Sequence, residues 1–399
     1  MPSKSDTPDF SYLSTHLTFP EVTASEKVAS GKLQQHIANA IKNHGGWIPF
    51  SHYMDMALYY PNLGYYMRHN QRFDLLGDYT TAPELTAYFA KILARQVAEI
   101  LPYCNHTLYE FGAGSGSLAW HLLRELDSMG TMPKAYYILD ISPALIRTQQ
   151  AKLQCYIDQQ QPRVQWIQQL PAQVTGLLIG NELLDAMPCE LIYWAESSVL
   201  RRGIQLYENR FEWADQPIAD AWLAQYARAL WPGKSYLSEV SLAQRAWLMD
   251  IAKRLTKGAV LLIDYGFPQR EYYHPQRIHG TLLGHYKQHV IDNPLFQPGL
   301  VDLTAHVNFT AIAETAIAQG LTLVGYTTQA NFLINGGILG DLADLKHVSS
   351  SGHYFEEVSA IQRLLSDAEM GDLFKVIGLS KNIPTTWLCF AKHDQSHLL

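Results

Sequence analysis

The strongest constraint on the fold comes from residues 108–129, where an apolar run, a glycine-rich turn and a helical pattern follow one another. The first four residues are typical of a buried strand, and residues 117–129 carry leucines at helical spacing. Three glycines between them allow a tight turn close to a ligand, and the free N–H groups of the helix would face that turn. The stretch predicts a cradle for a nucleotide-like ligand, formed by Gly112, Gly114 and Gly116.

Three further apolar runs, at residues 135–140, 177–188 and 259–266, are separated by helical patterns and carry polar groups near their ends. Such alternation is typical of an α/β fold with a doubly wound parallel sheet, in which ligands bind at the carboxyl ends of the strands. We therefore expect the terminal polar groups to gather at one site. They are Asp140, then Asn181, Glu182 and Asp185, and finally Asp264.

Shorter patterns complete the predicted organisation. Capping-box spacing starts helices at Thr23 and at Thr81, and the second helix is expected to run on to residue 100. Residues 190–215 alternate as a small antiparallel insertion would. Further helices are expected at residues 221–230, 241–255, 355–365 and 370–375, and the last strands at 321–326 and 386–392.

Composition excludes several classes of protein. A hydrophobic content of 47% with 17% charged residues indicates a globular chain with a sizeable core, and a net charge of −7 gives no reason to expect a nucleic-acid partner. The four scattered cysteines are expected to be buried thiols in a reducing compartment. No secretion signal and no run of about 18 apolar residues is present, so we expect a cytoplasmic protein without a membrane span.

Two ligands compete for the glycine turn. A dinucleotide site uses G-x-G-x-x-G, but here the third glycine comes one residue early. Glu110 precedes the turn, and its carboxylate would repel a pyrophosphate but suit an ammonium group. Asp140 is placed to accept hydrogen bonds from ribose hydroxyls. S-adenosylmethionine, with a ribose, an ammonium group and no phosphate, is therefore the expected cofactor.

A metal site is also considered, because His285 and His289 lie four residues apart. The sequence contains no His-Glu-x-x-His, and the residues between the two histidines are not clearly helical. We therefore expect these histidines to be loop residues and expect no metal.

Seven motifs together resemble the MidA family of S-adenosylmethionine-dependent methyltransferases, whose mitochondrial members assist the assembly of respiratory complex I. The resemblance extends from about residue 28 to the last strand. One departure is Asp140, where glutamate is usual in much of the family. The matching motifs are residues 77–84, 110–116, 181–188, 263–266, 280–286, 298–306 and 370–375.

The resemblance implies a class I, Rossmann-like methyltransferase fold with an N-terminal helical segment (residues 21–104), a methyltransferase domain (105–399) and insertions at about 190–258 and 267–310. It also implies a protein substrate that is methylated on arginine, with a complex I subunit as the expected target. From the residues alone, Asp78 and Thr81 only turn the chain and cap a helix, whereas the resemblance implies that their loop closes over the cofactor.

Methyl transfer to arginine requires aligned reactants and groups that bind a guanidinium. Glu182 and Asp185 are the predicted catalytic carboxylates, with Asp264 and Tyr265 as neighbours. The loops after residue 266 are predicted to line the substrate entrance with His285, His289, Asp302 and His306. Two alternatives stay open: a factor that binds S-adenosylmethionine without turnover, and a methyltransferase for small molecules or nucleic acid, since Asn181 resembles the amide of amino-group methyltransferases.

Overall fold

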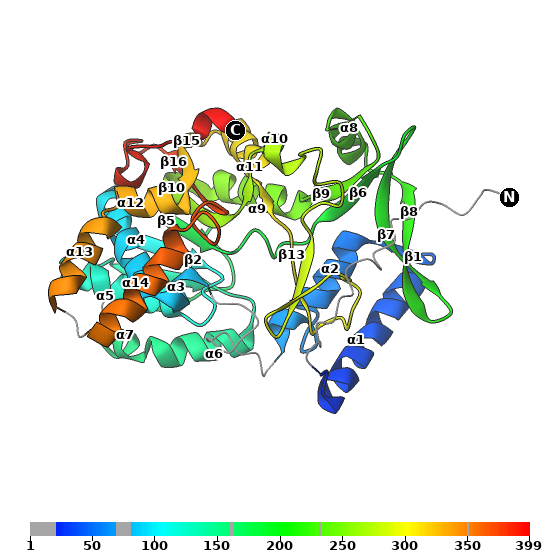
Figure 1. The fold of residues 1–399 in the computed structure, drawn as a ribbon, viewed down its shortest axis with the longest axis horizontal. Coiled ribbons are helices and arrows are strands. Elements are labelled where there is room, and N and C mark those ends of the chain that lie inside the picture. Colours follow the sequence, from blue (N-terminus) through cyan, green and yellow to red (C-terminus); the bar gives the residue numbers. More distant parts are fainter. Residues whose placement is uncertain (1–20, 69–80, 160–162, 231–232, 349–350) are drawn as a thin grey trace.

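The computed structural model describes residues 21–68, 81–159, 163–230, 233–348 and 351–399. It forms an α/β unit, at the left of Figure 1, and a smaller region on the right in which two helices pack against antiparallel strands. Asp78 lies outside the described residues. No helix in the described ranges is long and apolar enough to cross a membrane.

The α/β unit is built on an eight-stranded sheet with the order β15-β16-β10-β5-β2-β3-β4, and β14 also pairs with β10. The strands from β10 to β4 in this order are parallel to one another. The strand β16 runs antiparallel to both of its neighbours, β10 and β15. The predicted doubly wound parallel sheet is confirmed. Its strands are β2 (Thr107–Phe111), β3 (Ala135–Leu139), β4 (Arg163–Trp166), β5 (Val174–Asn181), β10 (Leu255–Phe267), β14 (Val307–Asn308), β15 (Thr322–Thr328) and β16 (Phe374–Lys381).

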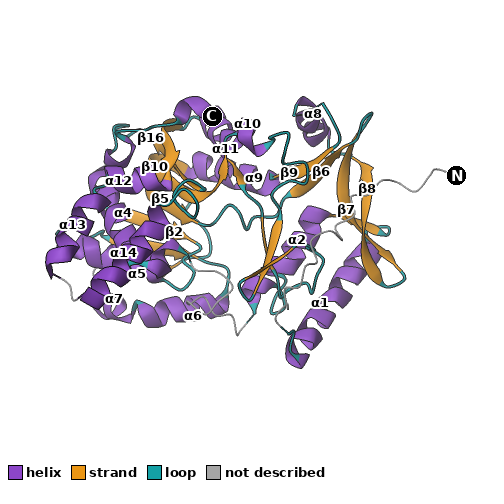
Figure 2. Ribbon diagram, viewed as in Figure 1, coloured by secondary structure: helices purple, strands orange, loops and turns teal. Residues whose placement is uncertain are grey.

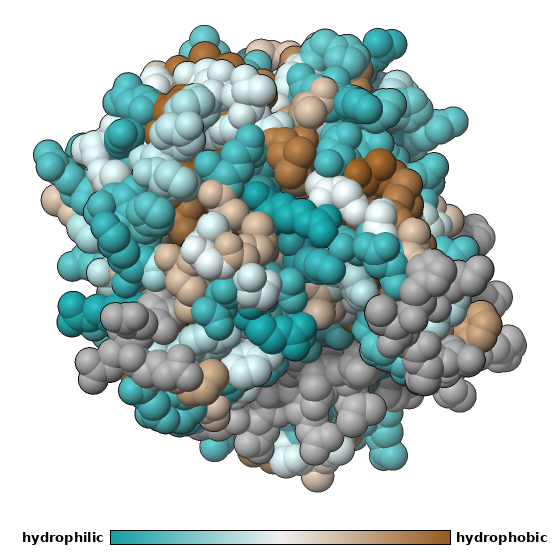
Figure 3. Space-filling view, turned by 90° about the vertical axis from the view of Figure 1, so that its left-hand side faces the viewer, coloured by the Kyte–Doolittle hydropathy of each residue, from teal (hydrophilic) through white to brown (hydrophobic). Residues whose placement is uncertain are grey.

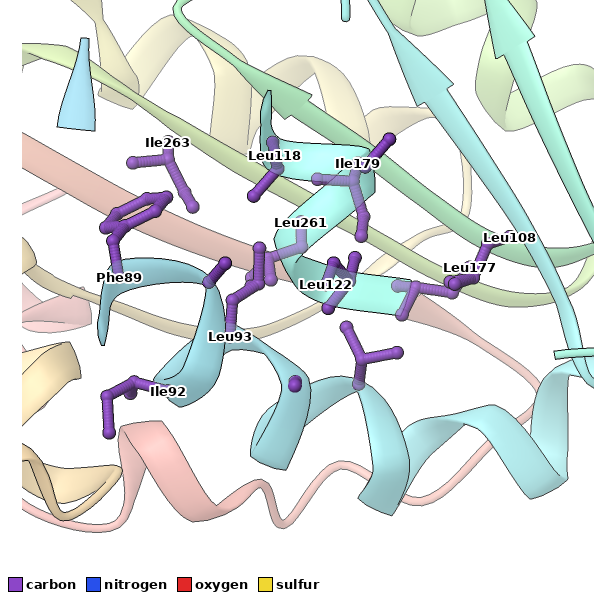
Figure 4. Packing of buried hydrophobic residues seen from close by; sticks show 14 of the residues in the cluster. Phe89, Ile92, Leu93, Leu108, Leu118, Leu122, Leu177, Ile179, Leu261 and Ile263 are labelled. Carbon is purple, nitrogen blue, oxygen red and sulfur yellow. The ribbon is translucent and has the colours of Figure 1, made fainter. Parts of the chain in front are cut away.

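Successive side chains of the central strands enter different cores, because side chains alternate across a sheet. Leu177 and Ile179 of β5 pack with α4 (Ala87–Ile100) and α5 (Ser117–Ser128), as Figure 4 shows. Leu178 packs instead with α9 (Leu242–Arg254) and α11 (Phe309–Ala318). Both faces of the sheet are therefore buried, which explains the near-continuous apolar runs.

The other helices mostly surround this sheet (Figure 2). On the face shown in Figure 3, apolar residues form separate patches among hydrophilic ones. The remaining helices are α3 (Ala82–Leu85), α6 (Pro143–Lys152), α7 (Gln154–Gln159), α8 (Ala221–Ala229), α10 (Gln269–Tyr272), α12 (Gln329–Asn335), α13 (Ile338–Val348) and α14 (Ser351–Leu365), with 3-10 turns η2 (Tyr65–Met67), η3 (Leu101–Cys104), η4 (Leu388–Phe390) and η5 (Ser396–Leu398).

The smaller region combines α1 (Ala24–Asn43) and α2 (Phe50–Tyr59) with two antiparallel sheets, around a third apolar core. The antiparallel strands expected in residues 190–215 are confirmed as β6, β7 and β8. The division into domains at residue 104 stays a prediction. The five-stranded sheet contains β1 (Trp47–Pro49), β6 (Glu190–Trp194), β7 (Val199–Tyr207), β8 (Arg210–Pro217) and β9 (Tyr236–Val240), and the three-stranded sheet contains β11 (Leu283–Tyr286), β12 (His289–Ile291) and β13 (Asp302–Thr304).

Two predicted elements near the C-terminus are wrong. Residues 386–392 are not a strand: they contain η4, whose Phe390 fits against Gly325, where a Cβ would come within 2.5 Å of its ring. Residues 370–375 are not a helix, because Phe374 starts β16 and pairs with Tyr265. Short mixed runs such as these take their structure from the neighbouring sheet.

Two smaller predictions also fail. The helix expected from residue 81 breaks at Thr86, which has an extended backbone (φ −159°) and accepts a hydrogen bond from the Tyr88 N–H to cap α4. Cys155 is exposed, whereas the other three cysteines are buried as expected.

Candidate active site

A cavity of about 500 Å³ opens at the carboxyl ends of β2, β3 and β5, and this volume is typical of a small-molecule site. The glycine turn and the segment after β3 line one end. The residues after β5, tyrosines in and after α2, and β13 line the rest. The α/β unit and the smaller region therefore both contribute walls.

The glycine turn has the backbone conformation that only glycine adopts easily. Gly112, Gly114 and Gly116 have φ values of +64°, +53° and +83°. The Gly112 N–H donates to the carbonyl of Leu139 at 2.9 Å, which fixes the turn to the end of β3. Gly116 is the N-cap of α5, so the free N–H groups of that helix start beside the cavity, as the sequence predicted.

Two acidic residues flank the turn and line the cavity. Glu110 is 2% exposed and accepts a hydrogen bond from the Tyr136 hydroxyl at 2.8 Å. Burial raises the pKa of Glu110 to about 7. Asp140 accepts from the Ser142 N–H at 2.9 Å and from Gln149 Nε2 at 2.7 Å, and burial also raises its pKa. Both carboxyls are held in fixed orientations.

Gln149 is a positioning residue that the sequence did not reveal. It is fully buried, and the same Nε2 donates to the Gly114 carbonyl at 2.9 Å. Its Oε1 accepts from the Trp166 indole at 2.8 Å. Gln149 therefore connects the glycine turn to Asp140. Its place in a helical pattern gave no signal, because a glutamine there is usually exposed.

The segment before α4 also touches the turn, but not by the predicted capping box. Thr81 lines the cavity, and its side chain makes no capping hydrogen bond. The Glu84 carboxylate instead accepts a hydrogen bond from the Ser115 hydroxyl. This contact connects α3 to the glycine turn.

A polar cluster after β5 also lines the cavity. Asn181 Nδ2 donates to Glu182 Oε1 at 3.1 Å, and Glu182 has a positive φ of +49° that aims its side chain away from the strand. Asp185 accepts a hydrogen bond from the Tyr265 hydroxyl. Its Oδ1 has no partner within the described ranges. The structure brings Asn181, Glu182, Asp185 and Tyr265 together at one place.

Burial perturbs both carboxyls of this cluster. It raises the pKa of Glu182 to about 8, with a further contribution from the nearby Asp185 charge. It raises the pKa of Asp185 to about 6, although the Tyr265 hydrogen bond opposes the change. Groups that change protonation near neutral pH in a cavity are suited to binding a cation or accepting a proton.

Asp264 lies beside the predicted catalytic carboxylates, as expected, but it does not itself line the cavity. Its Oδ2 accepts hydrogen bonds from the backbone N–H groups of Leu183, Leu184 and Asp185 at 3.1, 2.8 and 3.3 Å. Asp264 is therefore a positioning residue that holds the loop after β5. The sequence placed it at a strand end but could not show which way it points.

Of the four predicted substrate contacts, only Asp302 lines the cavity. His306 lies behind Tyr265 and stacks on Phe267 with ring centroids 5.3 Å apart. His285 is partly buried in β11, and burial lowers the pKa of both rings to about 4. His289 Nδ1 donates to the Lys287 carbonyl at 2.7 Å. Within the described residues, no three His, Cys, Asp or Glu side chains are grouped to hold a metal.

The chemistry of the lining fits S-adenosylmethionine. Six lining residues are acidic, whereas none of the described residues that line the cavity is lysine, arginine or histidine. The acidic lining disfavours a phosphate, but an ammonium or sulfonium group would be attracted. Asp140 would hold the ribose, and Glu110 with the glycine turn would hold the amino-acid part. The acids are Glu84, Glu110, Asp140, Glu182, Asp185 and Asp302.

Comparison with known proteins agrees with this chemistry. The family described as "Putative S-adenosyl-L-methionine-dependent methyltransferase" matches residues 92–327. A crystal structure from Burkholderia thailandensis with bound S-adenosyl-homocysteine is 39% identical, covers 95% of this chain and 100% of its own, and superposes with a TM-score of 0.89. A native crystal structure from the same organism is 38% identical, with the same coverage and a TM-score of 0.85.

Relatives at lower identity carry a more specific name. The mitochondrial protein arginine methyltransferase NDUFAF7 of Xenopus tropicalis is 26% identical, over 88% of this chain and 89% of its own length. The human protein of the same name is 24% identical, over 86% of this chain and 82% of its own length.

Proposed function

Because the chain belongs to this family and is an S-adenosylmethionine-dependent methyltransferase, we propose that it methylates an arginine side chain of a protein. One observation carries the proposal: the Asn181, Glu182 and Asp185 cluster shares a single cavity with the glycine turn. The name of the relatives at about a quarter identity supports arginine as the acceptor. Following the resemblance to the MidA family, we propose a respiratory complex I subunit as the protein substrate.

Bound S-adenosylmethionine would supply a methyl group on a sulfonium, which an attacking nitrogen takes in line as the sulfonium becomes a thioether. The chain contributes mainly alignment and charge. Glu182 and Asp185, when ionised, bind the guanidinium and orient its nitrogen. The methylated nitrogen then gives up one proton, and Glu182 is the proposed acceptor because its raised pKa matches that task near neutral pH.

Location is a separate proposal. We propose a cytoplasmic chain, on the sequence argument alone, although the eukaryotic relatives are named mitochondrial. Fractionation of the cells that produce it would test this.

The test of arginine methylation uses the full chain, isotope-labelled S-adenosylmethionine and an extract of a strain that lacks the gene. Mass spectrometry locates the label, and a separate assay measures S-adenosylhomocysteine. We expect label on arginine that is lost with Glu182→Gln. Label on another residue or on a small molecule would contradict the choice of acceptor. Cofactor binding without S-adenosylhomocysteine formation would indicate a binding factor instead of an enzyme.

A further inference from the structure

The part of the cavity beyond Asp185 is bounded by side chains from two segments that are far apart in sequence. Tyr59 is the last residue of α2, and Tyr66 lies in η2. Asp302 begins β13, 236 positions after Tyr66. All three line the same cavity as Glu182 and Asp185. The sequence indicated Asp302 as a substrate contact but gave the tyrosines no role.

Hydrogen bonds fix the orientation of both tyrosines. The Tyr59 hydroxyl donates to the Ala186 carbonyl, and the Tyr66 hydroxyl donates to Asp302 Oδ1, both at 2.9 Å. The two rings are stacked, with centroids 5.6 Å apart and an interplanar angle of 18°. Because each phenol donates its only proton, its oxygen can only accept hydrogen bonds from a ligand.

The turn between these tyrosines depends on a glycine. A Cβ on Gly64 would lie 2.5 Å from the Tyr60 nitrogen, so no larger residue fits without moving the backbone. The Gly64 N–H donates to the Tyr60 carbonyl at 2.8 Å and closes the turn. The turn therefore reverses the chain so that Tyr66 faces Tyr59.

The charge around this wall favours a cation with several N–H groups. Asp185 and Asp302 are 5% and 6% exposed, and no basic residue in the described part of the chain lines the cavity. Asp185 Oδ1, buried and without a partner among the described residues, is an acceptor that a ligand would satisfy. Aromatic rings add attraction for a cation placed near their faces.

We propose that Tyr59, Tyr66 and Asp302, together with Asp185, form a specificity pocket for a planar cationic side chain, a guanidinium. The inference rests on the proposed arginine methylation and deepens it. The carboxylates provide the charge, and the phenolic oxygens accept N–H groups. A guanidinium satisfies both, because it is planar, always charged and has five N–H donors.

A matched pair of small probes separates charge from shape. N-acetyl-arginine amide and N-acetyl-citrulline amide have similar outlines, but the urea of citrulline is neutral. The affinity of each is measured by ligand-observed NMR on the full chain saturated with S-adenosylhomocysteine. We expect the arginine probe to bind about tenfold more tightly, as one charge-assisted contact would give.

Variants then assign the preference to the pocket. Asp302→Asn should reduce the preference for arginine to about twofold, and Tyr66→Phe should lower affinity several-fold while keeping the ring. Tyr60→Phe is the matched control, since Tyr60 bonds to His36 and does not line the cavity. Affinity for S-adenosylhomocysteine verifies that each variant is folded.

Equal affinity for the two probes, or an unchanged preference in both Asp302→Asn and Tyr66→Phe, would overturn the pocket. These outcomes differ from a failure of the proposed function. If the arginine probe binds with the expected preference but no arginine in a protein is methylated, the pocket stands and the methyl-transfer proposal falls. If arginine is methylated but the variants do not alter probe binding, the methyl-transfer proposal stands and the pocket falls.

Discussion

The two ends of the cavity are built in different ways. The glycine-turn end is local: Glu110, the three glycines, Asp140 and Gln149 lie within 40 residues along the chain, on two adjacent parallel strands and the helices after them. The acceptor end gathers Tyr59, the cluster after β5 and Asp302 from three remote segments. The first can thus form wherever this sheet forms, whereas the second requires the smaller region to dock correctly.

The largest effect on cofactor affinity is expected from damage to the local end. Gly112→Val places a branched side chain at φ +64°, which costs about 1–3 kcal/mol, and brings it against Leu183. We expect affinity for S-adenosylhomocysteine, measured by calorimetry, to fall on the order of 100-fold. Gly130→Val is the matched control, with φ +67° and open space at the end of α5. Equal losses in both variants would mean general destabilisation.

At the acceptor end, Glu182→Gln should separate chemistry from cofactor binding. Removing the charge at nearly constant shape is expected to lower kcat/KM for methyl transfer by about 10²–10⁴-fold. Affinity for S-adenosylhomocysteine should stay within about twofold. Glu208→Gln, in the exposed turn between β7 and β8, serves as the control. Loss of cofactor affinity in Glu182→Gln would show that the two ends are not independent.

The pH dependence of methyl transfer should reflect the acceptor end, through Glu182. Because the pKa of Glu182 is raised to about 8, kcat/KM should rise with pH by up to about tenfold per unit between about pH 6 and 8. Bound sulfonium would move the midpoint lower. Glu182→Gln should lack this rise, and a wild-type profile that is flat over this range would contradict the assignment.

Stability has the opposite sign. The folded-state pKa of Glu182 lies above its ordinary value of 4.5. The protonated carboxyl therefore contributes its full stabilisation of the fold below about pH 4.5. This stability is lost as pH rises through about 8. The Tm of Glu182→Gln, measured by thermal unfolding, should therefore increase relative to the Tm of the wild type as pH increases.

The smallest effect is expected from Asp140→Asn. The amide keeps the shape of the side chain but loses one acceptor for the ribose hydroxyls, so S-adenosylhomocysteine should bind about tenfold more weakly. Methyl transfer at saturating cofactor should change little. A large fall in kcat would show that Asp140 also influences the acceptor end. Asp158→Asn, on the exposed side of α7, is a suitable control.

The sequence predicted the local end well because its signals are short-range. A strand, three glycines at fixed spacing and an acid after the next strand determine that geometry almost alone. The cluster at Asn181, Glu182 and Asp185 was also predicted, since the carboxyl ends of parallel strands meet at one edge.

The acceptor end was only partly predictable. Tyr59 and Tyr66 belong to an aromatic stretch that is equally typical of a core, and their contact with Asp302 spans 236 positions. The expectation that His285 and His289 are loop residues was wrong, because they belong to the paired strands β11 and β12. Pattern alone also does not show which side of a strand or loop faces a cavity. The strand β16 was missed for another reason: its first residues fall in the run 370–375, which was predicted to be helical.

Asp264 has a consequence for motion. Its carboxylate holds three consecutive amide N–H groups, those of Leu183, Leu184 and Asp185, in a segment that has no strand partner of its own. Such amides should exchange slowly with deuterated solvent, although they border a cavity. A large acceptor could then enter and leave repeatedly without loosening the carboxylates that receive it.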